Sequence, residues 1–230
     1  MKRTRILLAD DHILVMECIK LLLELEFDVV GTVADGRALL AEANKLKPDV
    51  IVLDVSMPVL NGIDAGMQLR RILPSAKLIY LTVYQDPILA DETLRFGASG
   101  YVLKSSAASE LCHAIHDALR GRSYVTPLLT QGRVAASFLQ GPHRQNRSRK
   151  VSARGREVLQ LLAEGRSMKE VAAILNITPR TVAFHKYKMM GQLQLKTNAA
   201  VAYRCTVRNP RVVWRARNPT LSCCGAPHMS

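Results

Sequence analysis

The chain has 230 residues, enough for one or two domains, and its hydrophobic fraction of 48% is ordinary for a globular protein. No apolar run reaches the roughly 18 residues that a membrane span needs. Two aspartates interrupt the apolar stretch after the basic start, which argues against a secretory signal. We therefore expect a cytoplasmic protein with no membrane partner. The five cysteines have neither paired spacing nor a histidine at zinc-finger distance, so no metal or redox role is predicted for them.

Charge is divided unevenly along the chain. Residues 1–122 contain 14 Lys and Arg and 16 Asp and Glu, a net charge of −2, whereas residues 123–230 contain 18 and 3, a net charge of +15. A basic surface that serves only solubility is one explanation, but it does not account for the scarcity of acidic residues. The asymmetry indicates two domains with different partners, and a polyanion such as nucleic acid for the second.

The first half alternates short apolar runs with segments of helical periodicity. The runs are rich in Val and Ile and end in polar residues, as strands do when both faces of a parallel sheet are buried. They occupy residues 5–11, 28–34, 49–55, 77–83 and 100–104. Five strand–helix repeats predict an α/β fold, a doubly wound (flavodoxin-like) five-stranded parallel sheet.

The second half is predicted to be helical. A helix over roughly 128–139 precedes a polar stretch without periodicity, and short helices with brief turns follow from Ser152, forming a small all-α four-helix domain. The chain after Arg208 is rich in Pro and Arg and is interpreted as a disordered tail. The predicted domains are 1–122, a linker with a short helix over 123–150, a second domain over 151–208, and the tail over 209–230.

Polar residues end four of the predicted strands. They are Asp10, Asp11, Asp54, Thr82 and Lys104. The carboxyl ends of parallel strands meet at one edge of the sheet, where ligands of such folds bind. Carboxylates gathered there repel one another, and a hard cation such as Mg²⁺ relieves that repulsion. A carboxylate of this kind can act as a nucleophile toward a phosphoryl group, with a lysine stabilising the transferring oxygens.

A plainer explanation is that these aspartates cap helices, which is common for a single residue but improbable for such a set. The stretches ADDH (9–12), LDVSMPVLNG (53–62), LTVYQ (81–85) and GYVLKS (100–105) resemble the signature stretches of response-regulator receiver domains. The resemblance covers nearly all of residues 4–122. His12 is interpreted as an exposed histidine at a helix start.

The resemblance implies a role for each matching position. Asp54 would accept the phosphoryl group, while Asp10, Asp11 and the backbone carbonyl of Ser56 would bind Mg²⁺ together with Asp54. Thr82 and Lys104 would be the switch pair, and Tyr101 the aromatic switch residue.

The segment 167–190 has the pattern of a helix, a turn and a second helix. Met168–Leu175 is amphipathic, Asn176 lies in the turn, and Thr178 is a good N-cap before a proline at the first helical position. In the second helix Val182, His185, Met189 and Leu193 repeat at helical spacing and are predicted to face the core. The opposite face is predicted to carry Arg180, Ala183, Phe184, Tyr187 and Lys188.

Exposed aromatic side chains beside cations suit a helix that lies in the DNA major groove. A charged surface helix, with Phe184 packed against the preceding helix, is the alternative. The stretches SARGREVLQLLAEG, EVAAIL, ITPRTVAFH and LKTNA resemble the LuxR-type DNA-binding domain, and the whole chain is similar to the NarL/FixJ response regulators. The resemblance implies that Ala183, Phe184 and Tyr187 face bases and that Arg180 and Lys188 contact phosphates. It also implies dimerisation through a helix near 199–203.

The preferred hypothesis is a transcriptional regulator controlled by phosphorylation, which binds double-stranded DNA as a homodimer and receives its phosphoryl group from a sensor histidine kinase. One alternative is an aspartyl-phosphate phosphatase, but Ser56 is a poor general acid at the position where such an enzyme needs one. Another is a receiver-based interaction module with impaired DNA binding, suggested by Gly191 inside the second helix. No nucleotide-binding loop of a kinase is present.

Overall fold

The computed structural model describes residues 3–130 and 152–193. The chain divides into two compact units, residues 1–141 and 142–230. No helix in the described parts of the chain is long and apolar enough to cross a membrane.

The first unit is built on a parallel sheet with the strand order β2-β1-β3-β4-β5-β6. Its strands are β1 (Arg5–Ala9), β2 (Asp28–Val33), β3 (Val50–Asp54), β4 (Lys77–Thr82), β5 (Gly100–Leu103) and β6 (Tyr124–Val125). The five predicted strands are confirmed. The sixth, which pairs with β5 at the edge of the sheet, was not predicted because two residues are too few to show a period.

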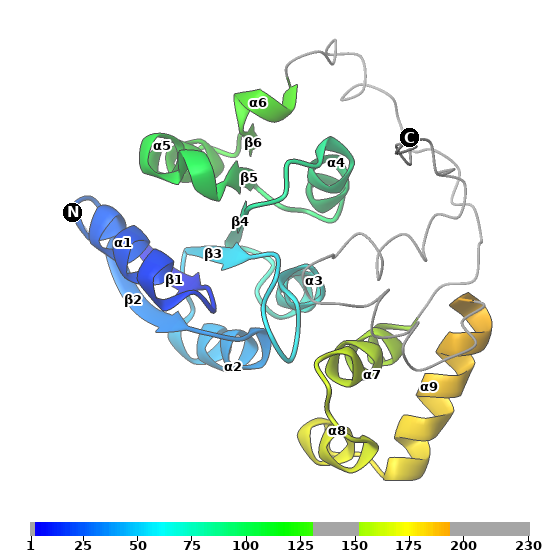
Figure 1. Cartoon of the computed structure of the whole chain (residues 1–230). Helices are drawn as coiled ribbons and strands as arrows, with labels where there is room; N and C mark the ends of the chain where they lie inside the picture. The colour runs from blue at the N-terminus through cyan, green and yellow to red at the C-terminus, as the bar shows by residue number, and fades with distance from the viewer. Residues whose placement is uncertain (1–2, 131–151, 194–230) are drawn as a thin grey trace, which may run out of the picture. The chain divides into compact units, whose positions relative to one another are not determined.

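Helices cover both faces of the sheet, with α1 and α5 on one face and α2, α3 and α4 on the other (Figure 1). They are α1 (Ile13–Glu24), α2 (Gly36–Leu46), α3 (Gly62–Ile72), α4 (Pro87–Arg95) and α5 (Ala107–Leu119), with a 3-10 turn η1 (Lys104–Ser106) and a short helix α6 (Pro127–Thr130). This coverage explains the continuous apolar runs, since every residue of β3 is buried. The predicted helix over 128–139 falls largely outside the described residues, and α6 ends at Thr130.

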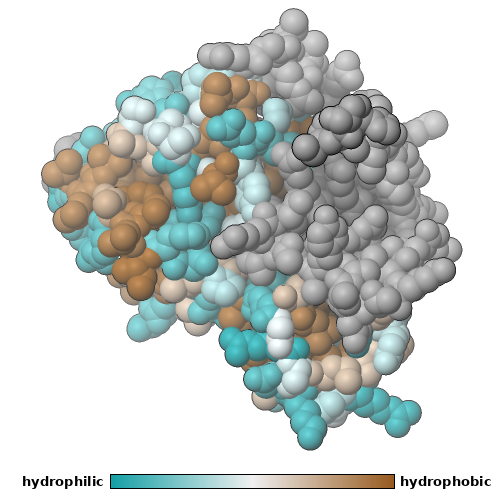
Figure 2. All heavy atoms as spheres, viewed as in Figure 1, coloured by the Kyte–Doolittle hydropathy of each residue, from teal (hydrophilic) through white to brown (hydrophobic). Residues whose placement is uncertain are grey.

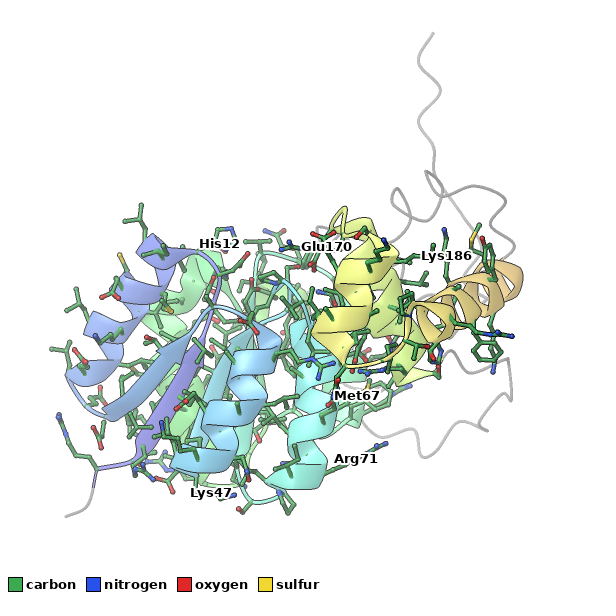
Figure 3. The ribbon with its side chains drawn as sticks, turned by 90° about the horizontal axis from the view of Figure 1, so that it is seen from below. His12, Lys47, Met67, Arg71, Glu170 and Lys186 are labelled. Atoms are coloured by element: carbon green, nitrogen blue, oxygen red, sulfur yellow. The ribbon has the colours of Figure 1, made fainter. Side chains whose placement is uncertain are left out.

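The two ends of the sheet differ in chemistry. Figure 3 labels His12, just after β1, at one end and Lys47, just before β3, at the other. Asp54 pairs with Leu81 and Thr82 pairs with Leu103 in adjacent strands, so the carboxyl ends of β3, β4 and β5 lie level. The register therefore brings the polar strand-end residues together.

Helix α1 exposes several apolar side chains beside the exposed Glu17 and Glu24. Ile13, Leu14, Leu21 and Leu25 are each more than half exposed, while Leu23 on the inner face is fully buried. Apolar atoms gather over α1 at the left of Figure 2. The opposite side of the helix packs into the core formed with β1, β3 and α5.

The second unit contains α7 (Ala153–Ala163), α8 (Met168–Leu175) and α9 (Pro179–Leu193), with α9 packed against both other helices. Asn176 ends α8 in the left-handed conformation, with φ +50°. Thr178 Oγ1 accepts a hydrogen bond from the Thr181 amide at 3.2 Å. The predicted helix–turn–helix is thus confirmed. The predicted helix near 199–203 and the tail after Arg208 lie outside the described residues.

Candidate functional site

Asp10 directly follows β1, and Asp54 ends the neighbouring strand β3. Both are almost completely buried, with 1% and 3% of their surface exposed. Lys104, just after β5, places its Nζ 2.6 Å from Asp10 Oδ2 and 3.2 Å from Asp54 Oδ2. The lysine ammonium therefore bridges the two carboxylates. This arrangement does not match the capping explanation, since Asp54 ends a strand and holds an ion pair instead of a helix terminus.

Burial dominates the electrostatics of Asp54. It raises the pKa of the Asp54 carboxyl above its usual value, because charge is costly in a desolvated site. The neighbouring Lys104 lowers the pKa and the neighbouring Asp10 raises it. A group that binds this carboxylate and carries positive charge would relieve the cost.

The residues at this edge fit a hard divalent cation. Carboxylate oxygens of Asp10, Asp11 and Asp54 and a ring nitrogen of His12 all lie within 4.8 Å of one another. Asp10 Oδ2 is buried and accepts no hydrogen bond of standard geometry, although the Lys104 ammonium lies close to it. Three carboxylates around one point are the oxygen-rich donor set that Mg²⁺ prefers.

His12 is the N-cap of α1, and its Nδ1 lies 3.2 Å from Asp10 Oδ1 and 3.0 Å from Asp11 Oδ1. The ring is 62% exposed. Its exposure agrees with the sequence interpretation, whereas its contact with both acidic residues was not foreseen.

A hydrogen-bond network joins the ends of β3, β4 and β5 through Tyr84. The Tyr84 amide donates to Thr82 Oγ1, and the Tyr101 hydroxyl donates to the Tyr84 carbonyl, each at 3.1 Å. Ser56 Oγ also donates to the Tyr84 hydroxyl at 3.1 Å. Thr82 and Tyr101 are fully buried. The Thr82 hydroxyl is therefore already engaged, as the acceptor of the Tyr84 amide.

In the second unit, the buried and exposed residues of α9 are largely those predicted from the sequence. Val182 and Met189 are buried, whereas Phe184 and Tyr187 are 60% and 64% exposed. His185 is half-buried, and burial followed by the nearby cations Arg154 and Lys188 lowers its pKa. The side chain of Leu193 lies outside the described residues.

Four of the five side chains predicted on the outer face of α9 are exposed. Arg180 and Lys188 are exposed and Ala183 is half-buried. Lys188 Nζ lies 5.6 Å from the ring centroid of Phe184, a cation–π distance. The exposure of Phe184 contradicts the alternative in which this ring is core packing against α8.

Comparison with known proteins assigns the two halves of the chain to two different domain families. Residues 6–116 match the response regulator receiver domain, and residues 149–205 match the bacterial regulatory proteins of the luxR family. The oxygen regulatory protein NreC of Staphylococcus carnosus is 33% identical over 201 residues, which cover 84% of this chain and 92% of NreC.

The chain is a response regulator of the NarL/FixJ family.

Solved structures of related response regulators agree. RcsB of Salmonella typhimurium is 28% identical, with a TM-score of 0.59 over 88% of this chain and 96% of RcsB. A second RcsB structure holds two dimers bound to two parallel DNAs, with a TM-score of 0.53, 28% identity and coverage of 88% and 97%. This response regulator therefore combines a receiver domain with a LuxR-type helix-turn-helix domain, as its transcriptional relatives do.

The sequence did not predict the contacts of two residues in the receiver. Tyr84 lies within the LTVYQ stretch and no role was predicted for it, yet it contacts Ser56, Thr82 and Tyr101. Thr126 lies in the predicted linker, yet it is 2% exposed and hydrogen-bonded to β5. An aromatic residue two positions beyond a strand-end threonine was the only signal available for the first, and no signal existed for the second.

Proposed function

We propose that this response regulator is phosphorylated on Asp54 by a partner histidine kinase and that phosphorylation controls its binding to promoter DNA. The observation that carries the proposal is the contact of Lys104 Nζ with both Asp10 and Asp54 at the carboxyl edge of the sheet. Such an arrangement supplies a nucleophile and a fixed positive charge at the same point.

In the transfer step an oxygen of Asp54 attacks the phosphorus of a phosphohistidine. A phosphorus–oxygen bond forms and the phosphorus–nitrogen bond breaks, so the imidazole leaves with the electron pair. Lys104 then pairs with a phosphoryl oxygen, and the Thr82 hydroxyl donates to another after it separates from Tyr84. Tyr101, which contacts the Tyr84 carbonyl, responds to that separation.

Asp10, Asp11, Asp54 and the backbone carbonyl of Ser56 would hold Mg²⁺, which supplies positive charge to offset the phosphoryl oxygens. The Lys104 ammonium is shared between two buried carboxylates, and a phosphoryl group adds further negative charge. A requirement for the cation in phosphoryl uptake follows from that imbalance.

The DNA-binding half is proposed to act as a dimer on double-stranded DNA, with α9 in the major groove. The dimeric, DNA-bound RcsB structure supports this assignment. Ala183, Phe184 and Tyr187 would face the bases, and Arg180 and Lys188 the phosphates. We also propose that the protein works in the cytoplasm, where bacterial DNA lies, and that it has no enzymatic turnover of its own beyond the receiver's phosphoryl chemistry.

The test is phosphoryl uptake from acetyl phosphate, read by mass spectrometry of the intact chain with Mg²⁺ and with chelator. We expect one added phosphate on the wild type with Mg²⁺, and none on Asp54→Asn. Asp49→Asn is the matched control, because Asp49 directly precedes β3 at the opposite end of the same strand. Equal labelling of Asp54→Asn and wild type would refute the assignment.

A further inference from the structure

The short strand β6 joins the sheet at β5, beside the proposed phosphorylation site. Gly100 pairs with Tyr124 and Tyr101 with Val125. The Thr126 amide then donates to the Tyr101 carbonyl at 3.0 Å, which continues the parallel pattern by one residue. In a regular parallel ladder the Thr126 carbonyl would next accept from the Leu103 amide.

Thr126 departs from that pattern in a specific way. Its hydroxyl, not its carbonyl, accepts the hydrogen bond from the Leu103 amide, at 3.0 Å. The carbonyl is thereby left to accept from the Leu129 amide at 2.9 Å, which starts α6. One residue thus serves as the last acceptor of the sheet and as the first acceptor of the next helix.

The hydroxyl is held in this position from a second side. Thr126 Oγ1 donates to Glu110 Oε2 of α5 at 2.7 Å, so its donor and acceptor functions are both used. Thr126 is 2% exposed and Leu129 is 6% exposed, so the junction is buried among packed residues. A buried and fully bonded side chain has one preferred geometry, which makes it a stiff connection.

The strand on the other side of this junction carries the switch positions of the receiver. Tyr101 lies in β5 and bonds to Tyr84, Leu103 ends β5, and Lys104 follows and contacts Asp54. From α6 the chain continues through residues 131–151 toward α7. Thr126 therefore stands in the covalent path between the switch strand and the DNA-binding half.

We propose that Thr126 is the joint that passes a displacement of β5 to the chain leading into the DNA-binding domain. The proposal rests on the proposed function, since it takes phosphorylation of Asp54 as the event that displaces β5. When Tyr101 and Lys104 rearrange, two hydrogen bonds move the start of α6 with β5: the Thr126 amide donates to the Tyr101 carbonyl, and the Leu103 amide donates to the Thr126 hydroxyl. Without the hydroxyl, Thr126 loses its bond with Leu103 and keeps its bond with Tyr101, so the movement that reaches α6 is reduced.

The experiment compares full-length wild type, Thr126→Val, Thr126→Ser and Thr130→Val. Valine keeps the shape of threonine and removes the hydroxyl, whereas serine keeps the hydroxyl. Thr130, at the end of α6, is the matched control because its hydroxyl donates to the nearby Pro127 carbonyl and, among the described residues, makes no hydrogen bond with β5. Each protein is assayed for phosphate uptake from acetyl phosphate and for DNA affinity with and without beryllofluoride and Mg²⁺.

Wild type, Thr126→Ser and Thr130→Val are expected to gain DNA affinity with beryllofluoride, within the roughly 5- to 150-fold range typical of allosteric coupling. Thr126→Val is expected to take up phosphate normally while its gain in DNA affinity falls below about twofold, and the amide of Leu103 should exchange faster with solvent. If Thr126→Val does not fold, Thr126→Ala replaces it, since that change also removes the hydroxyl that accepts from the Leu103 amide.

Two failures are distinguishable. A wild type that takes up no phosphate or shows no response to beryllofluoride refutes the proposed function itself. A wild type that responds, together with an equally responsive Thr126→Val or Thr126→Ala, overturns the role of Thr126 and leaves the proposed function intact.

Discussion

Glycine 62, at the first position of α3, lies so close to the proposed phosphorylation site that a side chain there has no room. A Cβ atom at Gly62 would be 1.9 Å from the carbonyl oxygen of Asp54. Since a backbone atom cannot rotate away, Gly62→Ala must shift α3 or the end of β3. We expect a loss of roughly 1–3 kcal/mol in the free energy of unfolding and reduced phosphate uptake, measured by urea denaturation and mass spectrometry.

Gly191 provides the contrasting case. A Cβ atom there would meet no described atom within 4 Å. Gly191→Ala should therefore raise the stability of α9 by up to about 1 kcal/mol, the difference in helix propensity. Stabilisation by both substitutions alike would show that no clash governs Gly62 and that helix propensity decides at both positions.

Phe184 permits a test of sequence readout. Its ring is 60% exposed, so it is available to a ligand. An aromatic edge and the methyl group of Ala183 can touch the C5-methyl of thymine but cannot form a bidentate bond with guanine. We expect A·T-rich half-sites and a loss of roughly 1–3 kcal/mol at those sites for Phe184→Ala, measured by motif selection and binding titration.

Lys188→Ala is the companion variant. It should weaken binding to selected and random DNA alike and reduce the salt slope by about one unit, because a lysine–phosphate contact carries no sequence information. An unchanged selected motif for Phe184→Ala, with a lower melting temperature, would place the ring in a structural role after all.

At the residue scale the strand-end polar groups could be predicted because their positions follow from strand direction alone. Asp10, Asp54 and Lys104 meet as expected for that reason. Tyr84 could not be assigned its role in the same way. Its contacts depend on the conformation of the loop after β4, which no period in the sequence encodes.

At the element scale, α8 begins with a complete capping box. The Ser167 side chain accepts from the Glu170 amide at 3.3 Å, and the Glu170 carboxylate accepts from the Ser167 amide at 2.8 Å. Ser167→Ala should destabilise the helix-turn-helix by about 1 kcal/mol, seen as faster hydrogen exchange in the first turn of α8. Ser109→Ala is the control, since that exposed hydroxyl donates to the local carbonyl of Ser106 and lies in the receiver.

The same cap should weaken in acid. The hydrogen bonds from Ser167 lower the pKa of Glu170 below its usual value of 4.5. The stabilisation is therefore fully present above that value and is lost as pH falls through the lowered pKa. Protection factors in the first turn of α8, which compare the observed exchange rate with the intrinsic rate at the same pH, should fall over that range in the wild type. No fall there, or an equal fall in the Glu170→Gln variant, would contradict this account.

Elements long enough to show a periodic sequence pattern were predicted well, whereas the two-residue strand β6 was not. The apolar runs of β1, β3 and β4 are long enough to be seen, and the N-cap at Thr178 marks the start of α9. Strand β6 has two residues and depends on pairing with β5, more than twenty positions earlier in the chain. Such a strand is created by tertiary contact and leaves no local pattern.

At the scale of the whole molecule, the charge difference between the halves predicts strongly salt-dependent DNA binding. The half from residue 123 onward carries a net charge of +15, and each cation that neutralises a phosphate releases counterions. We expect the affinity of the full-length protein to fall at least about tenfold between roughly 50 and 200 mM salt. Fluorescence anisotropy with labelled duplex is the measurement.

The receiver half supplies the control for that measurement. Residues 1–122 carry a net charge of −2, and a fragment ending at 130 should show no DNA binding at any salt concentration. Affinity of the full-length protein that stayed constant across the salt range would refute the electrostatic account.

The sixth strand also decides where this protein should be cut in the laboratory. A receiver fragment that stops at residue 122, the boundary expected from the sequence, removes Tyr124, Val125 and Thr126 and leaves the backbone of β5 open along its outer side. An uncovered strand edge is a template for pairing with other molecules. A fragment that ends at 130 keeps that edge covered, so self-association seen with the shorter one would report the missing strand and not a natural dimer.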